Sequence, residues 1–151
     1  MKTIRQFFLN RTSKKLSKVL SNLESELMDV VIIVLLKAFS MVFCLDKTFR
    51  KNIEGFNAVY AFKSEDGKIA VSAIFKDNKM KVKSSALPDA NVTIILKNGK
   101  VLCDFALSGD PDIFNLVLTN RMSWEGNVNY LMKFAYMGMH LATLLKIQVT
   151  K

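Results

Sequence analysis

The chain has 151 residues and a mass of 17.1 kDa, the size of one domain with a substantial hydrophobic core. Half of its residues are hydrophobic and the mean hydropathy is +0.20, which excludes an intrinsically disordered protein. The formal net charge of +9 predicts an acidic partner. The lysines are scattered and the sequence has no zinc-finger or RNA-binding motif, so an anionic membrane surface is favoured over nucleic acid as this partner.

Residues 1–28 predict a basic, amphipathic helical extension. From Ser13 onward, apolar residues recur at helical spacing on one face, and lysines lie on the other: Leu16, Val19, Leu20, Leu23 and Leu27 against Lys14, Lys15 and Lys18. Such a helix binds an anionic bilayer through its lysines, or it packs on the domain or on a second subunit. The segment lacks the apolar run and cleavage site of a signal peptide, so we expect a cytoplasmic protein, either free or peripheral to the membrane.

The most apolar segment is 29–45, which is uninterrupted from Val30 to Leu36 and is then broken by Lys37. A membrane-spanning helix needs about 20 apolar residues, and a lysine near its centre costs about 2.5 to 3.5 kcal/mol. We therefore predict a buried helix and not a membrane span.

After this helix the hydrophobic period changes to two, which predicts strands. Turns are expected at Asp66-Gly67 and Asp77-Asn78, and a loop containing Pro88 precedes the fourth strand. We expect an antiparallel meander with one face covered, formed by strands at 56–62, 69–76, 79–83 and 91–97.

Two short helices and a fifth strand are expected next. Asn98 is a candidate cap for a helix that ends at Gly109. Asp110 followed by Pro111 is a typical N-cap and first-turn pair for the second helix, and the fifth strand is expected at 121–125.

The last helix is predicted at 128–146, after a turn at Gly126 and an N-cap at Asn127. Its polar residues form one narrow stripe: Asn129, Lys133, Tyr136, His140 and Thr143. We expect His140, on this stripe, to face solvent. A helix lying on a sheet needs an apolar face of about 100°, and this helix has a wider one. The surplus predicts cover by other protein, by a partner or by an apolar ligand.

These elements, in this order, resemble the sterol carrier protein 2 (SCP2) family of lipid-binding domains over 52–147. The matching pieces are the strand 56–62 with its Asp66-Gly67 turn, the strand entry 88–94, the helix end at 108–110 and the turn 124–127. Asn91 stands where the family often has an aspartate, the last helix is unusually rich in methionine, and the N-terminal third extends beyond the core domain.

The resemblance implies an α+β domain over 29–151. It would consist of a five-stranded, mainly antiparallel sheet whose covering helices, all on one face, enclose a hydrophobic tunnel for lipid. The lining we expect is Phe105, Phe114, Leu118, Trp124, Leu131, Phe134, Ala135 and Met139. A charged residue at position 134 is then expected to abolish lipid uptake while the fold survives. The alternatives are a dry core, and a peripheral-membrane or assembly protein, for example for lipophilic quinone synthesis, in which the apolar helices contact a bilayer or a second copy.

The sequence gives no pattern for catalysis, a metal or a cofactor. Cys44 and Cys103 are far apart in apolar contexts, which is typical of a reducing compartment and not of a disulfide framework. With His140 as the chain's one histidine, neither a histidine-based metal site nor a thiol and base pair is indicated. We predict a binding protein and no enzyme.

Overall fold

The structure, a computed structural model, describes residues 28–101 and 112–150. The predicted amphipathic helix with Lys14, Lys15 and Lys18 and the candidate lining residue Phe105 lie outside the described residues. The helix predicted after Asn98 is described at its start only: residues 99–101 are helical, and the amide of Val101 donates to Asn98 Oδ1 at 3.2 Å, so the predicted cap is confirmed.

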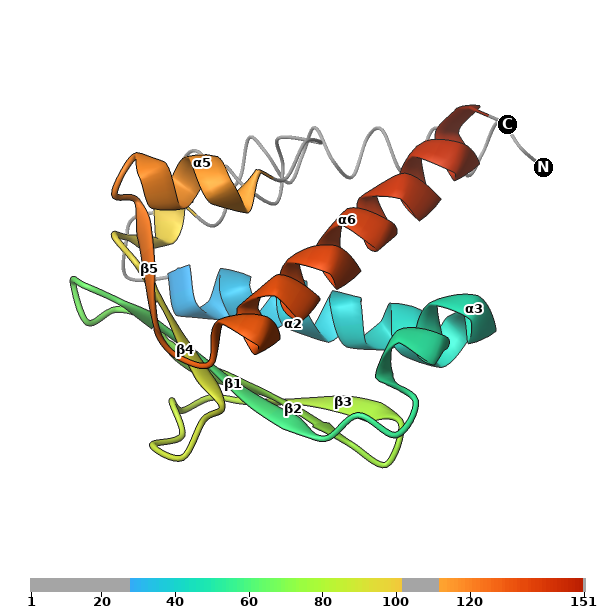
Figure 1. Cartoon of the computed structure of the whole chain (residues 1–151), viewed down its shortest axis with the longest axis horizontal. Helices are drawn as coiled ribbons and strands as arrows, with labels where there is room; N and C mark the ends of the chain where they lie inside the picture. The colour runs from blue at the N-terminus through green and yellow to red at the C-terminus, as the bar shows by residue number, and fades with distance from the viewer. Residues whose placement is uncertain (1–27, 102–111, 151) are drawn as a thin grey trace.

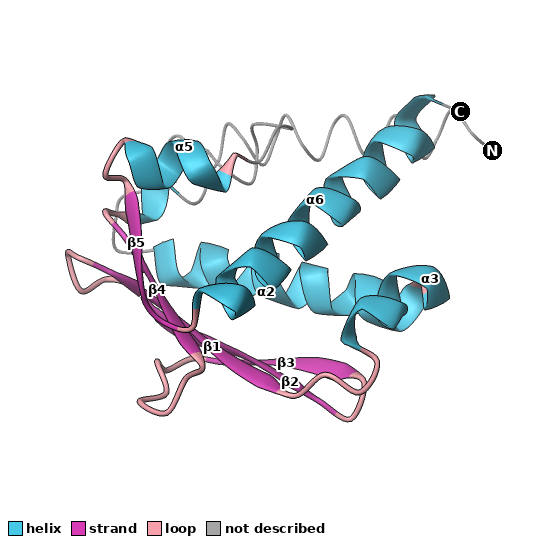
Figure 2. Cartoon of the chain, viewed as in Figure 1, coloured by secondary structure: helices cyan, strands magenta, loops and turns pink. Residues whose placement is uncertain are grey.

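A five-stranded sheet carries the described helices on one face (Figures 1 and 2). The strands are β1 (Ala58–Ser64), β2 (Ala70–Lys76), β3 (Lys79–Lys83), β4 (Val92–Leu96) and β5 (Met122–Gly126). The helices are α2 (Met28–Leu45), α3 (Lys47–Arg50), the short 3-10 helix η2 (Lys51–Ile53), α5 (Ile113–Leu118) and α6 (Val128–Thr150). The predicted α+β architecture, with helices covering one face of a mainly antiparallel sheet, is confirmed.

The predicted four-strand meander is wrong at its last step. The strand order is β3-β2-β1-β4-β5, so β4 pairs with β1, in parallel, and not with β3. The three lysines Lys79, Lys81 and Lys83 alternate along β3 and are exposed, which suits an edge strand that must not pair further. Strand β4 is apolar at each position except Thr93, and it lies between β1 and β5.

The loop from β3 to β4 is anchored on the buried hydroxyl of Ser72 in β2. Ser72 Oγ donates to the carbonyl of Ser85 at 2.8 Å and accepts from the amide of Leu87 at 2.9 Å. These bonds hold the crossover close to the sheet, because the loop's backbone groups would otherwise be unpaired.

We expect Ser72→Ala to lower the free energy of unfolding by about 1 to 3 kcal/mol, since both loop groups lose their partner in a buried place. Urea denaturation measures this, with Ser123→Ala on the exposed side of β5 as the control. Equal losses in the two variants would contradict the anchoring role.

Helix α2 is buried on one side only, whereas the sequence predicted a buried helix. Its core side carries Ile32, Leu36, Phe39 and Phe43. On the neighbouring side, Ser40 Oγ donates to the carbonyl of Met80 in β3 at 2.6 Å. The opposite side exposes Val30, Val34, Met41 and Leu45. Among the described residues, no helix has both the length and the hydropathy needed to cross a bilayer.

Helix α5 begins later than predicted. Its N-cap is Asp112, whose carboxylate accepts from the amide of Asn115 at 3.0 Å, and its first residue is Ile113. The expected cap pair Asp110 and Pro111 lies before this start and outside the described residues. The carboxylate of Asp112 satisfies the first-turn amide, and this fixes the start of the helix two residues further on.

The predicted start of the last helix is confirmed. Gly126 has a φ of +101°, and Asn127 caps α6 through a hydrogen bond from the amide of Asn129 to Asn127 Oδ1 at 2.9 Å. The helix then runs through Thr150, four residues beyond the predicted end at 146.

Candidate functional site

The middle of α6 is fixed to the sheet by an aromatic cluster around Phe134. The ring centroid of Phe134 lies 5.2 Å from that of Tyr60, 5.4 Å from that of Phe62 and 5.7 Å from that of Phe39. One turn earlier, Leu131 is buried in the same core. Two of the predicted lining residues, Leu131 and Phe134, are therefore packed between α6 and the elements beneath it.

Tyr60 lies at the bottom of this cluster with its hydroxyl paired. The hydroxyl donates to the carbonyl of Tyr130 at 2.8 Å. Burial, and to a smaller extent the neighbouring Tyr130, raises the pKa of Tyr60 above its ordinary value of about 10. Tyr60 is thus neutral at physiological pH and contributes a satisfied polar group to an apolar wall.

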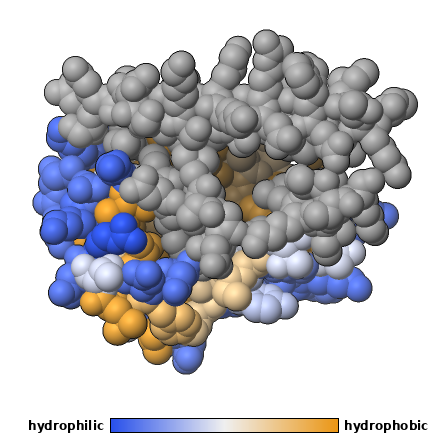
Figure 3. Space-filling view, turned by 90° about the horizontal axis from the view of Figure 1, so that it is seen from above, coloured by the Kyte–Doolittle hydropathy of each residue, from blue (hydrophilic) through white to orange (hydrophobic). Residues whose placement is uncertain are grey.

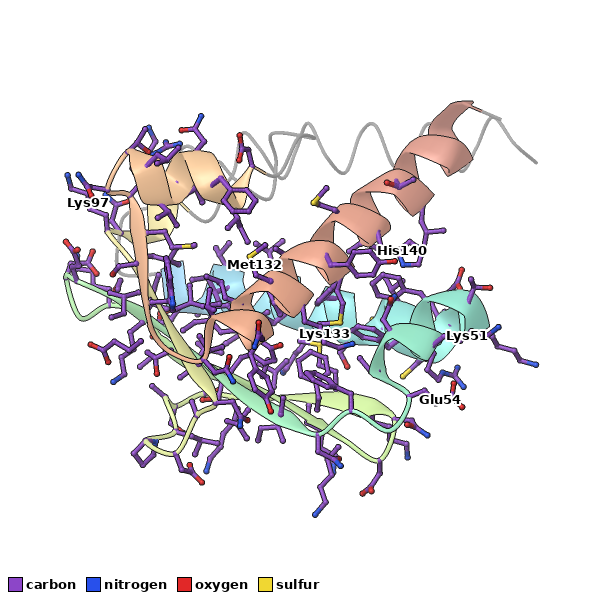
Figure 4. All side chains as sticks on the ribbon, in the orientation of Figure 1. Lys51, Glu54, Lys97, Met132, Lys133 and His140 are labelled. Atoms are coloured by element: carbon purple, nitrogen blue, oxygen red, sulfur yellow. The ribbon has the colours of Figure 1, made fainter. Side chains whose placement is uncertain are left out.

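The polar stripe of α6 faces protein over part of its length, and the expectation that His140 faces solvent is wrong. Lys133 Nζ lies 4.6 Å from the ring centroid of Phe56, and the amide Nδ2 of Asn52 donates to His140 Nδ1 at 2.9 Å. The His140 ring also lies 5.2 Å from that of Phe49. Lys133 and His140 point toward the α3 side of the molecule (Figure 4). The polar and apolar pattern of one helix does not show which other elements the helix contacts. It therefore could not show that this side of α6 contacts α3, η2 and Phe56.

The other side of α6 exposes hydrophobic side chains toward α5. Met132 lies on this side, opposite Lys133 and His140 (Figure 4). Met132 is 41% exposed and Met139 is 56% exposed. On α5, Phe114 and Leu118 are 61% and 82% exposed, although Ile113 and Leu116 of the same helix are buried.

Trp124 extends this apolar surface onto the edge strand β5. It pairs with Ile94 in β4, and Ile94 pairs with Phe62 in β1, so the three side chains form a row on the sheet face that the helices cover. Because Trp124 stands at the end of the row, 36% of its surface stays exposed. Figure 3, seen from above the helix layer, shows hydrophobic residues among the described part of this face.

The predicted lining residues therefore fall into two groups. Phe114, Leu118, Trp124 and Met139 are exposed apolar side chains on α5, β5 and α6, whereas Leu131, Phe134 and Ala135 pack against or within the core. We name the exposed group, with Met132 added, the apolar rim: Phe114, Leu118, Trp124, Met132 and Met139.

Sequence reasoning missed Met132 and Gly138. Met132 lies within the predicted helix 128–146 but was not selected as a lining residue, because periodicity alone does not distinguish the core side from the α5 side. Gly138 offered a signal, since a glycine inside an apolar helix is unfavourable and calls for a reason. Among the described residues, no three histidine, cysteine or acidic side chains are grouped closely enough to hold a metal ion.

Comparisons with known proteins give similarity at the level of structure. No protein-family model and no curated protein matches the sequence. The UbiJ-SCP2 ubiquinone synthesis protein superposes with a TM-score of 0.57 at 19% identity, over 77% of this chain and 96% of that one. The sterol carrier protein domain 2 of Helicoverpa armigera gives 0.55 at 20% identity, over 72% and 85%. Sterol carrier protein 2 from Yarrowia lipolytica, in its apo form, gives 0.54 at 19% identity, over 78% and 92%.

A partial match to an enzyme is also present. The sec-alkylsulfatase Pisa1 from Pseudomonas superposes with a TM-score of 0.50 at 18% identity, over 58% of this chain but only 14% of the enzyme. This chain thus corresponds to a small part of that enzyme's length.

The described residues define an α+β protein in which one helical layer covers a mixed five-stranded sheet. Three SCP2 structures align along most of their own length, so this chain has the SCP2 fold. The resemblance predicted from the sequence is confirmed at the level of the fold.

Proposed function

We propose that the protein binds a lipid or another long apolar molecule without catalysing a reaction, and that the ligand lies against the apolar rim between α5, β5 and α6. The observation that carries this proposal is the exposure of five large hydrophobic side chains on α5, β5 and α6. A monomeric surface of this kind normally marks a binding site. The names of the structural neighbours, which are sterol carrier domains and a ubiquinone synthesis protein, support the same class of ligand.

The binding energy would come from partition of the ligand out of water. A chain that loses roughly 400 Å² of apolar surface gains about 10 kcal/mol before the costs of association. Methionine adapts to irregular apolar shapes, and Met132 and Met139 contribute two such side chains. Recognition of this kind predicts broad specificity for apolar ligands, since few polar contacts fix the ligand.

A second candidate function is supported by the exposed side of α2. Val30, Val34, Met41 and Leu45 give this helix a second apolar face, which a bilayer or a second copy of the chain could cover. In this function the domain is a peripheral-membrane or assembly factor in the cytoplasm, and the basic segment 1–28 contributes Lys14, Lys15 and Lys18 to an anionic surface. Removal of 1–28 would then abolish liposome binding and leave uptake of the apolar ligand unchanged.

We expect the double variant Leu118→Asp/Met139→Asp to lower lipid uptake at least about tenfold, because an apolar ligand would bury charges that have no partner. Both side chains are exposed, so the fold should be retained. Uptake is measured by native mass spectrometry of protein purified from cells and by titration with fluorescent fatty acids.

The matched control is Val34→Asp on the exposed side of α2, which should leave uptake unchanged. Undiminished uptake by the Leu118→Asp/Met139→Asp variant would contradict the site. A protein that carries nothing from cells and takes up no fatty acid, phospholipid or quinone would favour the second function.

A further inference from the structure

Gly138 stands on the core-facing half of α6, beside an open space. Phe134 and Ala135 precede it by one turn and Leu141 follows three residues later, and all three pack against the hydrophobic core. A Cβ built on Gly138 nevertheless meets no described atom within 4 Å. The space beside Gly138 is therefore not filled by other described residues, although the residues on either side of it along the same face of α6 contact the core.

The fold itself gives no reason for a glycine at this position. A glycine in a helix interior is less favourable than alanine, because it loses more backbone freedom on folding. Gly55, Gly67 and Gly126 have positive φ values, but Gly138 lies within the regular helix α6 and is absent from that group. Nor does a neighbouring backbone approach it closely, in contrast to Gly126.

We infer that the apolar chain of the ligand passes directly over Gly138, and that this residue sets the width of the binding space. This inference rests on the proposed function and adds to it a residue that determines which ligands fit. Gly138 is half-buried, so part of its surface is accessible from outside the protein, and Met139 of the apolar rim follows it in the chain. Between Val128 and Met139 the helix spans about 16 Å, which gives an extended chain room to lie along α6.

The first test fills the space. Gly138→Leu should lower the affinity of the full-length protein for the fluorescent fatty acid cis-parinaric acid at least tenfold. The melting temperature should stay equal or rise, because leucine favours the helix. The matched control is Thr143→Leu, which adds a leucine to the exposed side of the same helix and should bind the probe as the wild type does. Wild-type affinity in the Gly138→Leu variant would overturn the inference while leaving the proposed function intact.

The second test needs no large side chain and stays informative if leucine disturbs the fold. In Gly138→Cys, the bound probe should slow alkylation of the new thiol at least fivefold, as followed by peptide mass spectrometry, which separates it from Cys44 and Cys103. In Thr143→Cys, the probe should leave the alkylation rate unchanged. Equal rates with and without probe at position 138 would overturn the inference. If the wild-type protein takes up no probe in either test, the proposed function fails, and this inference fails with it.

Discussion

Gly126→Ala is expected to lower the free energy of unfolding by about 3 kcal/mol or more. The residue has a φ of +101°, which a residue with a Cβ adopts only under strain of about 1 to 3 kcal/mol. A Cβ at this position would also lie 2.6 Å from the backbone oxygen of Asn91 and 3.2 Å from the Cα of Val92. Both atoms belong to the main chain, so relief of the clash requires the strands to move apart.

The displacement would affect the junction at which β1, β4, β5 and α6 meet. Asn91 bonds to Val59 of β1 twice, through its amide at 2.8 Å and its Oδ1 at 2.7 Å, and its carbonyl accepts from the amide of Asn127 at 3.1 Å. The Oδ1 of Asn91 thus accepts here, at the position where the family that the sequence resembles often has an aspartate. The start of α6, and with it the placement of the apolar rim, depends on this junction.

Urea denaturation of Gly126→Ala and Gly67→Ala measures the effect. Gly67 has a comparable positive φ of +73°, but no described atom lies within 4 Å of a Cβ built there. Its substitution should cost only the backbone strain, about 1 kcal/mol. Equal losses for the two variants would show that the close approach to Asn91 is without consequence.

Turns and caps could be predicted from the sequence because they depend on a few adjacent residues. The turn at Asp77-Asn78 has φ values of +54° and +57°, which asparagine and aspartate tolerate better than most residues. The cap at Asn127 depends on one side chain and one amide. The partner of β4 could not be predicted in this way, because a period of two determines which residues share a face and not which strand lies beside them.

The candidate site was predicted less completely for the same physical reason. The sequence showed that α6 is apolar over more than one face, but the sides of the helix have three different surroundings. One side packs on the sheet core, one contacts the α3–η2 segment, and one, with Met132 and Met139, is exposed. His140 was assigned to solvent and instead bonds to Asn52, 88 residues earlier in the chain. Phe134 and Met139 were grouped together, although Phe134 packs against the core and Met139 is exposed.

Phe134→Ala is expected to lower the free energy of unfolding by about 3 to 5 kcal/mol, as is usual for loss of a packed phenylalanine. The ring joins three elements, since its contacts are Phe39 of α2 and Tyr60 and Phe62 of β1. A charged residue at position 134 would bury an unpaired charge in this cluster, so it would unfold the domain instead of removing lipid uptake alone.

The comparison with Met139→Ala separates packing from binding. Met139 is 56% exposed on the same helix, so its truncation should cost less than about 1 kcal/mol while weakening lipid uptake. Denaturation and probe binding of both variants give the two quantities for each residue. A loss below about 1 kcal/mol for Phe134→Ala would place the ring in the binding space and not in the core. A large loss of unfolding free energy in Phe134→Ala would assign structural packing to the sheet side of α6. Weaker lipid uptake by a stable Met139→Ala would assign ligand contact to the side facing α5.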